Sequence, residues 1–323
     1  MAAHDHAPRV IAEAAYEVAF LAVMDSLACA FKALHDPACA KLLGALVPGA
    51  TMAFGARVPG TSYQLDPVQA AFNIGTTVSW LQANDPALTT VAGDVSDNLG
   101  AILAVADYRA RQAIAEAASP PTVRDLFGAL IHARELASLE WARSVHEHAA
   151  VSTNKGTESI ASAAARCALT RIASAATAAS LLGGTRDQVA AAVLIARSEP
   201  CVTEHPGTAP VGGWHEPWRI GDATSRGLRL ALIALAGPIA PRLPALPSDK
   251  GTWQLAVTAE LDQTWRDVAA RPDIANRIRD RFAACVAAYF PTAQASKLGA
   301  MFADRAKLEA VPVNELVSMT VRN

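Results

Sequence analysis

QLDPVQAAFNIGTTVSWLQANDPALTTVAGDVSDNLGAILAVADY, residues 64–108, is the stretch that decides the fold. Pro67 lies where a helix can begin, because the first turn of a helix leaves its N–H groups unsatisfied in any case. Apolar residues then recur at helical spacing as far as Leu81, and a second, almost wholly apolar segment runs over residues 98–107. Ser96 is a good N-cap for this second segment. The stretch predicts two core helices joined by a short polar loop.

The loop between these helices holds Asp85 and Asp94. Core helices flank it on both sides, so side chains of the loop are expected to lie close to an apolar wall. Acids in a loop of this kind either form ordinary turns or serve chemistry. Both interpretations stay open on the spacing alone.

The rest of the chain also predicts helix, because alanine is abundant and β-branched runs with period-two alternation are missing. Breaks are expected at the proline and glycine pairs between the helices. We predict an all-α protein with a flexible tail at residues 1–8 and one helical domain over residues 9–323. The helices are expected at residues 9–34, 37–46, 67–84, 98–107, 122–148, 160–182, 185 onward, 227–236 and 252–309, the last with breaks at Pro272 and Pro291.

Composition excludes several classes of protein. The chain has 323 residues, of which 52% are hydrophobic and 18% charged, so it can bury a large core. The net charge of −2 without a basic block argues against a nucleic-acid partner. Apolar runs such as residues 228–236 are too short to cross a membrane, and residues 1–8 do not resemble a secretion signal. With five cysteines and no C-x-x-C spacing, we expect a cytoplasmic protein.

Few sequence motifs indicate a particular chemistry. The chain has no Walker loop, G-x-S-x-G, G-x-G-x-x-G or H-E-x-x-H motif, and we expect neither a metal nor a cofactor. A second irregular stretch, residues 199–218, gathers Glu204, His205, His215 and Glu216 among glycines and prolines. Acid–base chemistry by Asp, Glu and His in apolar surroundings is what remains. The residues alone indicate a helical enzyme or a helical scaffold.

Several longer motifs follow one another along the chain: VPGT at 58–61, DPVQAAFNIG at 66–75, SDNLGAILAVADY at 96–108, GDATSR at 221–226, FPT at 290–292, DRAKLE at 304–309 and PVNE at 312–315. In these motifs the chain resembles the MmgE/PrpD family, and most closely its 2-methylcitrate dehydratases. This resemblance implies a large all-helical domain, a homodimer, and cofactor-free proton transfer on a small-molecule substrate that carries carboxylates.

One departure from the family concerns the domain organisation. In the family, a smaller α/β domain is inserted before the C-terminal helices, and the substrate cleft lies between the two domains. Here only a short helical link, residues 248–276, is expected at that place. A more open cleft follows from this interpretation.

The other departure concerns the residues that the resemblance implies for catalysis. Asp94 stands where the family has its catalytic histidine, and Glu216 aligns with the family lysine. The histidine of the long central helix aligns near Arg166, and the one expected after Phe290 falls on Ala295. Only Asp85 keeps the family identity. Two acids in place of two cations are expected to repel anionic carboxylates.

Three hypotheses follow for the function. The first is a rewired enzyme that carries out dehydration, isomerisation or cyclisation on a larger, less charged substrate than methylcitrate, in a biosynthetic pathway. The second is an inactive dimeric scaffold or partner subunit, and the third is a 2-methylcitrate dehydratase-type hydro-lyase. The candidate catalytic residues are Asp94, Glu216, Asp85, His205 and His215, and the candidate substrate-binding residues are Ser96, Asn98, Arg166, Trp214 and Trp218.

Overall fold

The computed structural model describes residues 11–90, 92–149, 163–199, 218–237 and 251–322. Helices dominate this part of the chain, which confirms the predicted all-α class. The α-helices are α1 Glu13–Ala33, α2 Pro37–Leu42, α3 Pro67–Ser79, α4 Leu99–Ala115, α5 Val123–Ala149, α6 Ala163–Leu181, α7 Arg186–Ser198, α8 Arg219–Ala236, α9 Gly251–Ala269, α10 Pro272–Tyr289, α11 Thr292–Met301, α12 Arg305–Glu309 and α13 Val313–Met319.

Two small hairpins interrupt the helices, which the period-two pattern had not predicted. β1 (Ala56–Arg57) pairs antiparallel with β2 (Gln64–Leu65), and β3 (Thr89–Thr90) pairs antiparallel with β4 (Gly93–Asp94). Each strand has only two residues, too few to show an alternating pattern in the sequence. The second hairpin lies in the loop between α3 and α4, together with the 3-10 turns η1 (Pro86–Leu88) and η2 (Val95–Asn98).

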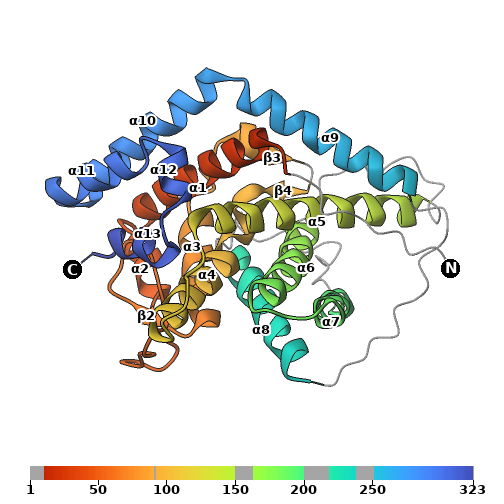
Figure 1. Cartoon of the computed structure of the whole chain (residues 1–323), viewed down its shortest axis with the longest axis horizontal. Coiled ribbons are helices and arrows are strands. Elements are labelled where there is room, and N and C mark those ends of the chain that lie inside the picture. The colour runs from red at the N-terminus through yellow and green to blue at the C-terminus, as the bar shows by residue number, and fades with distance from the viewer. Residues whose placement is uncertain (1–10, 91, 150–162, 200–217, 238–250, 323) are drawn as a thin grey trace.

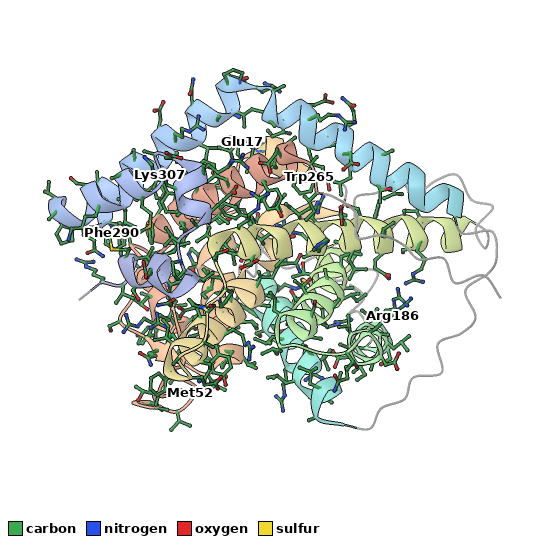
Figure 2. All side chains as sticks on the ribbon, viewed as in Figure 1. Glu17, Met52, Arg186, Trp265, Phe290 and Lys307 are labelled. Atoms are coloured by element: carbon green, nitrogen blue, oxygen red, sulfur yellow. The ribbon has the colours of Figure 1, made fainter. Side chains whose placement is uncertain are left out.

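Two helical layers surround a continuous apolar core. Helices α3, α4, α6 and α8 pack on one another, and α5 and α7 lie against α6. Above them in Figure 1, α9, α10 and α11 form an arc over α1. Trp265 of α9, labelled in Figure 2, is only 4% exposed, and Phe290 packs edge-on against Phe31 of α1 with ring centroids 4.9 Å apart. The arc therefore buries the upper face of α1.

By length and composition, helix α1 could cross a membrane, whereas the apolar run at residues 228–236 is too short. In the fold, 89% of its most apolar window is buried. Helices α3, α5, α9 and α10 all pack against it. The apolar length of α1 is thus accounted for by its place in the core.

Two sequence expectations differ from the structure in detail. The turn that opens the second core helix is capped by Asp94 instead of Ser96, because the chain enters η2 one residue before the serine. Residues 248–276, expected as a short helical link, contain α9 and the start of α10, which begins at Pro272. The helices also continue past Glu309 into α13. The predicted tail at residues 1–8 lies outside the described residues.

Candidate functional site

Two motifs far apart in the sequence form a common base for the site. A Cβ added to Gly100 of α4 would lie 2.5 Å from Thr224 Cγ2 of α8 and 2.6 Å from the carbonyl oxygen of Ala71 in α3. Only glycine lets these three helices approach so closely. Thr224 Oγ1 in turn accepts a hydrogen bond of 3.0 Å from the Ala101 N–H. The GDATSR motif therefore fixes the start of α4.

Asn98 extends this network into α6. Its Nδ2 donates to the Thr170 carbonyl oxygen at 2.9 Å and to Ser174 Oγ at 2.8 Å, and Ser174 Oγ lies 3.0 Å from Thr224 Oγ1. Asn98 is 4% exposed. The side chain that the sequence suggested for substrate binding thus also ties α4 to α6. Ser96, likewise buried, lies within η2.

The chain turns sharply into the site at Gly93. Its φ of +109° lies in the region that L side chains rarely adopt, and a Cβ there would lie 2.6 Å from Asp97 Oδ2. Asp97 Oδ2 also accepts a 3.2 Å hydrogen bond from the Asp94 N–H. Glycine at this position therefore lets the backbone carry Asp94 close to Asp97.

Asp94, Asp97 and Arg166 form a charge cluster at the start of η2, in which Asp97 is buried and Asp94 and Arg166 are half-buried. Arg166 Nε donates to Asp97 Oδ2 at 2.7 Å, and its Nη2 donates to both Asp97 Oδ1 and Asp94 Oδ2. Thr89 Oγ1 donates to Asp94 Oδ1. Burial raises the pKa of Asp97, and Arg166 opposes that rise. The structure thus joins Asp94 and Arg166, two residues that the sequence had proposed separately.

A second arginine, Arg134 of α5, lies close enough to this cluster to interact electrostatically with Asp97, Asp94 and Arg166. Its residue is 2% exposed. Burial lowers the pKa of Arg134 to about 10, Arg166 adds to the fall, and the two carboxylates oppose it. Arg134 is a cation at neutral pH. The four side chains therefore combine two positive charges with two carboxyl groups, so the arginines offset the negative charge that Asp94 brings to the site.

Asp85 lies at the other end of the loop, in a separate set of ion pairs. Arg277 of α10 donates from Nε to Asp85 Oδ2 at 2.7 Å and from Nη2 to Asp85 Oδ1 at 2.9 Å. Burial would raise the pKa of Asp85, but Arg277 and the Ala87 N–H outweigh it and hold the pKa below its usual value. The Asp85 N–H donates to Asp25 Oδ2 at 2.9 Å, and Asp25 pairs with Arg281.

The remaining candidates are only partly placed. Trp218 is the residue before α8 and is 38% exposed. Glu216, His205, His215 and Trp214 lie outside the described residues, so their roles stay predictions. Among the residues that are described, no group of three or more His, Cys, Asp or Glu side chains is arranged to hold a metal ion.

An apolar groove of about 460 Å³ lies elsewhere, between α1, α10 and α11. It is lined by Met24, Phe282, Val286 and Phe302, and also by Ala295, where the resemblance expected a histidine. Neither Asp85 nor Asp94 lines this groove. Within the described residues, the charge cluster around Asp94 is therefore the better candidate site.

Known proteins match the same part of the chain. The model of the MmgE/PrpD N-terminal domain matches residues 2–263, which include the loop, α5, α6 and the GDATSR motif. The chain belongs to the MmgE/PrpD family. It is 40% identical to 2-methylcitrate dehydratase of Salmonella typhimurium over 228 residues, which are 71% of this chain and 44% of that protein.

Other MmgE/PrpD relatives give the same result. The 2-methylcitrate dehydratase of Cupriavidus necator is 41% identical over 223 residues, 69% of this chain and 43% of its own length. The mitochondrial 2-methylcitrate dehydratase of Yarrowia lipolytica is 36% identical over 236 residues, 72% of this chain and 42% of its own. The chain thus spans less than half the length of these relatives.

Sequence reasoning missed Asp97 and Arg134 as site residues. Asp97 lies within the motif at residues 96–108, from which only Ser96 and Asn98 were named as candidates. A signal for Arg134 was present: in GALIHARELA it falls on the same stripe as Leu130 and Ala137, which are both buried. A charged residue on an apolar stripe is rarely buried unless it is paired.

Proposed function

We propose that this chain is a hydro-lyase-type enzyme that acts on a carboxylic acid by cofactor-independent acid–base chemistry. Asp94 serves as the proton-transfer group in place of the family histidine. The observation that carries the proposal is the position of Asp94, which binds Arg166 and Thr89 and lies near the buried Arg134. The names of the relatives support the reaction class.

The chemistry needs one base and one acid. In a dehydration, the base takes a proton from the carbon next to a carboxylate, the hydroxyl leaves from the neighbouring carbon after protonation, and a C=C bond forms as water departs. Asp94 is the proposed base. Glu216, with His205 or His215, is the proposed acid. Isomerisation and cyclisation would share the first proton transfer, so they remain variants of the same proposal.

The substrate follows from the local charge. Arg166 is already bound by Asp97 and Asp94, and Glu216 stands where the resemblance expects a cation. Fewer cations are therefore free to hold carboxylates than in a site that binds three of them. We propose a larger substrate with fewer carboxylates than methylcitrate, in a biosynthetic pathway, processed by a homodimer in the cytoplasm.

The test is a panel of 2- and 3-hydroxy acids with one, two or three carboxylates, including 2-methylcitrate. Formation of the conjugated C=C bond is followed by ultraviolet absorbance and the product by NMR, while light scattering gives the oligomeric state. We expect faster turnover of the mono- and dicarboxylates. Preference for 2-methylcitrate would favour the 2-methylcitrate dehydratase-type alternative, and a folded dimer without any turnover would favour the scaffold.

A further inference from the structure

Arginines of this protein repeatedly bind carboxylates through one edge of the guanidinium, the Nε–H and Nη2–H pair. Arg277 binds Asp85 in this way, Arg197 binds Glu140 and Arg226 binds Glu199. Arg166 binds Asp97 through the same two groups. This edge matches the spacing of two carboxylate oxygens, which makes the contact bidentate.

Arg134 differs from these arginines. Its Nε and Nη2 are buried and have no hydrogen-bond partner among the residues that the structure describes. Donors buried without a partner are costly, and a buried cation costs more than a neutral group. We therefore expect that a residue retained in spite of this energetic cost has a function.

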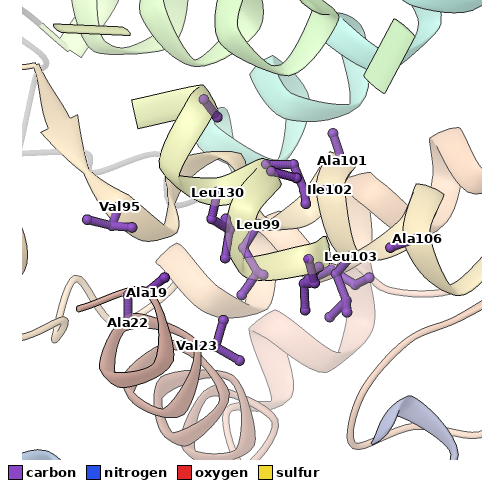
Figure 3. Packing of buried hydrophobic residues seen from close by; sticks show 14 of the residues in the cluster. Ala19, Ala22, Val23, Val95, Leu99, Ala101, Ile102, Leu103, Ala106 and Leu130 are labelled. Atoms are coloured by element: carbon purple, nitrogen blue, oxygen red, sulfur yellow. The ribbon is translucent and has the colours of Figure 1, made fainter. Parts of the chain in front are cut away.

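The position of Arg134 places these donors at the candidate site. Arg134 lies one helical turn after Leu130, so both residues share a face of α5. Figure 3 shows Leu130 next to Leu99, the first residue of α4. Helix α5 also packs against η2, which contains Asp97. The guanidinium is thus close to the cluster while the carboxylates there are engaged by Arg166 and Thr89.

We propose that Arg134 binds a carboxylate of the substrate through its Nε and Nη2 groups, beside the Asp94 that performs the proton transfer. The assignment rests on the proposed function, because it supplies the contact that would orient the substrate against Asp94. The class of ligand is an organic carboxylate. A carboxylate offers two acceptor oxygens at the spacing of these donors and a negative charge that complements the guanidinium.

The test measures carboxylate binding without turnover. Thermal unfolding of the 323-residue chain is recorded against increasing succinate and citrate, with Arg134→Gln as the variant. Arg109→Gln, an exposed position on α4, is the control with the same change of charge. For the wild type and Arg109→Gln we expect a saturable rise in Tm with at least one of the two acids. Arg134→Gln should raise the Kd about 10- to 100-fold, because it removes a charge-assisted pair of hydrogen bonds.

Arg134→Lys and the ligand-free Tm guard against a folding defect. Lysine keeps the charge but cannot form the planar bidentate contact, so its Kd should lie between those of the wild type and Arg134→Gln. Without ligand, Arg134→Gln should melt at or above the wild-type temperature, because an unpaired buried charge is removed. A large fall in the ligand-free Tm would mean that a carboxylate of this chain is the real partner, and would overturn the proposal.

The two proposals fail in different ways. If Arg134→Gln binds both acids as tightly as the wild type, or the wild type binds neither, the assignment of Arg134 is overturned whatever the turnover shows. If carboxylates bind through Arg134 but no hydroxy acid is dehydrated, the proposed function fails while the carboxylate site stands. If turnover is found, Arg134→Gln should raise KM more than it lowers kcat.

Discussion

The loop between α3 and α4 carries an acidic group near each end, and the two ends are built differently. At Asp85, both carboxylate oxygens accept hydrogen bonds from the Arg277 guanidinium, and Asp25 and Arg281 form a neighbouring pair. At Asp94, the half-buried Arg166 binds two carboxylates, and the buried Arg134 has Nε and Nη2 groups without a partner among the described residues.

The difference separates a structural use of charge from a functional one. Matched pairs such as Asp85 and Arg277 hold the loop against α10 and leave little capacity for a ligand. At the Asp85 end, Arg281 also has buried N–H groups without a hydrogen bond, but Asp25 forms an ion pair with it. At the Asp94 end, the Nε and Nη2 groups of Arg134 have no partner among the described residues, and apolar side chains would serve stability alone better there. The following experiments are ordered from the largest expected effect to the smallest.

Replacement of Asp94 should give the largest effect, and it should be on rate. Asp94→Asn keeps the size and can still cap η2, because Asn caps helices as well as Asp does. It removes the proton acceptor, so turnover should fall about 100- to 10,000-fold. Steady-state kinetics with the substrate found in the panel measures this effect. Normal turnover would show that Asp94 acts only as a helix cap.

Replacement of Gly93 should give the largest loss of stability. Gly93→Ala forces a side chain into a φ of +109° and toward Asp97 Oδ2, which we expect to cost about 2–4 kcal/mol of unfolding free energy. Gly183→Ala is the matched control, since Gly183 has a φ of +83° and no atom within 4 Å of an added Cβ. Urea unfolding measures both. Equal losses would show that the contact with Asp97 contributes nothing.

Replacements at the Asp85 end should lower the free energy of unfolding less than Gly93→Ala does. Asp85→Ala removes the cap on the Ala87 N–H, which we expect to cost about 1–2 kcal/mol. Arg277→Gln should lower Tm less, because that side chain is half exposed. The double variant should be little less stable than Asp85→Ala alone, because each single change already removes the same Asp85–Arg277 contact. Additive losses would refute the pairing.

The pH dependence of this pair should be the smallest effect. The folded pKa of Asp85 is lowered from 3.8, so the pair stabilises the protein above that value. The contribution is lost as the pH falls through the lower, folded pKa. Tm values of the wild type and Arg277→Gln should therefore converge below pH 4. A difference that stays constant from pH 7 to pH 3 would contradict the ionic contribution.

The sequence predicted most of the helices because their periodicity and capping residues are local signals. Pro67 and Pro272 are the first residues of α3 and α10, and Thr185 caps the start of α7. The hairpin that precedes η2 could not be predicted, since two residues in a strand show no period. The ion pairs of Asp85 were also hidden, because Arg277 lies 192 residues away and on a helix with no motif of its own.

The candidate site was predicted in part. Resemblance led to Asp94 and Arg166, and the structure brings them into contact. It did not lead to Asp97 or Arg134, because their roles depend on how α5 and α6 meet the start of α4. Glu216, His205, His215 and Trp214 remain predictions, as they lie outside the described residues.

The place of α1 has a consequence for the synthesis of the protein. Its apolar surface is covered on one side by α10, whose first residue is separated from Ala33 by about 240 positions. At roughly 5–20 residues per second, the ribosome needs about 12–50 s to produce that cover. During this interval a 21-residue apolar helix lacks part of its final shelter. Nascent chains of this protein are therefore expected to engage a chaperone, and a stall before α10 should lead to aggregation.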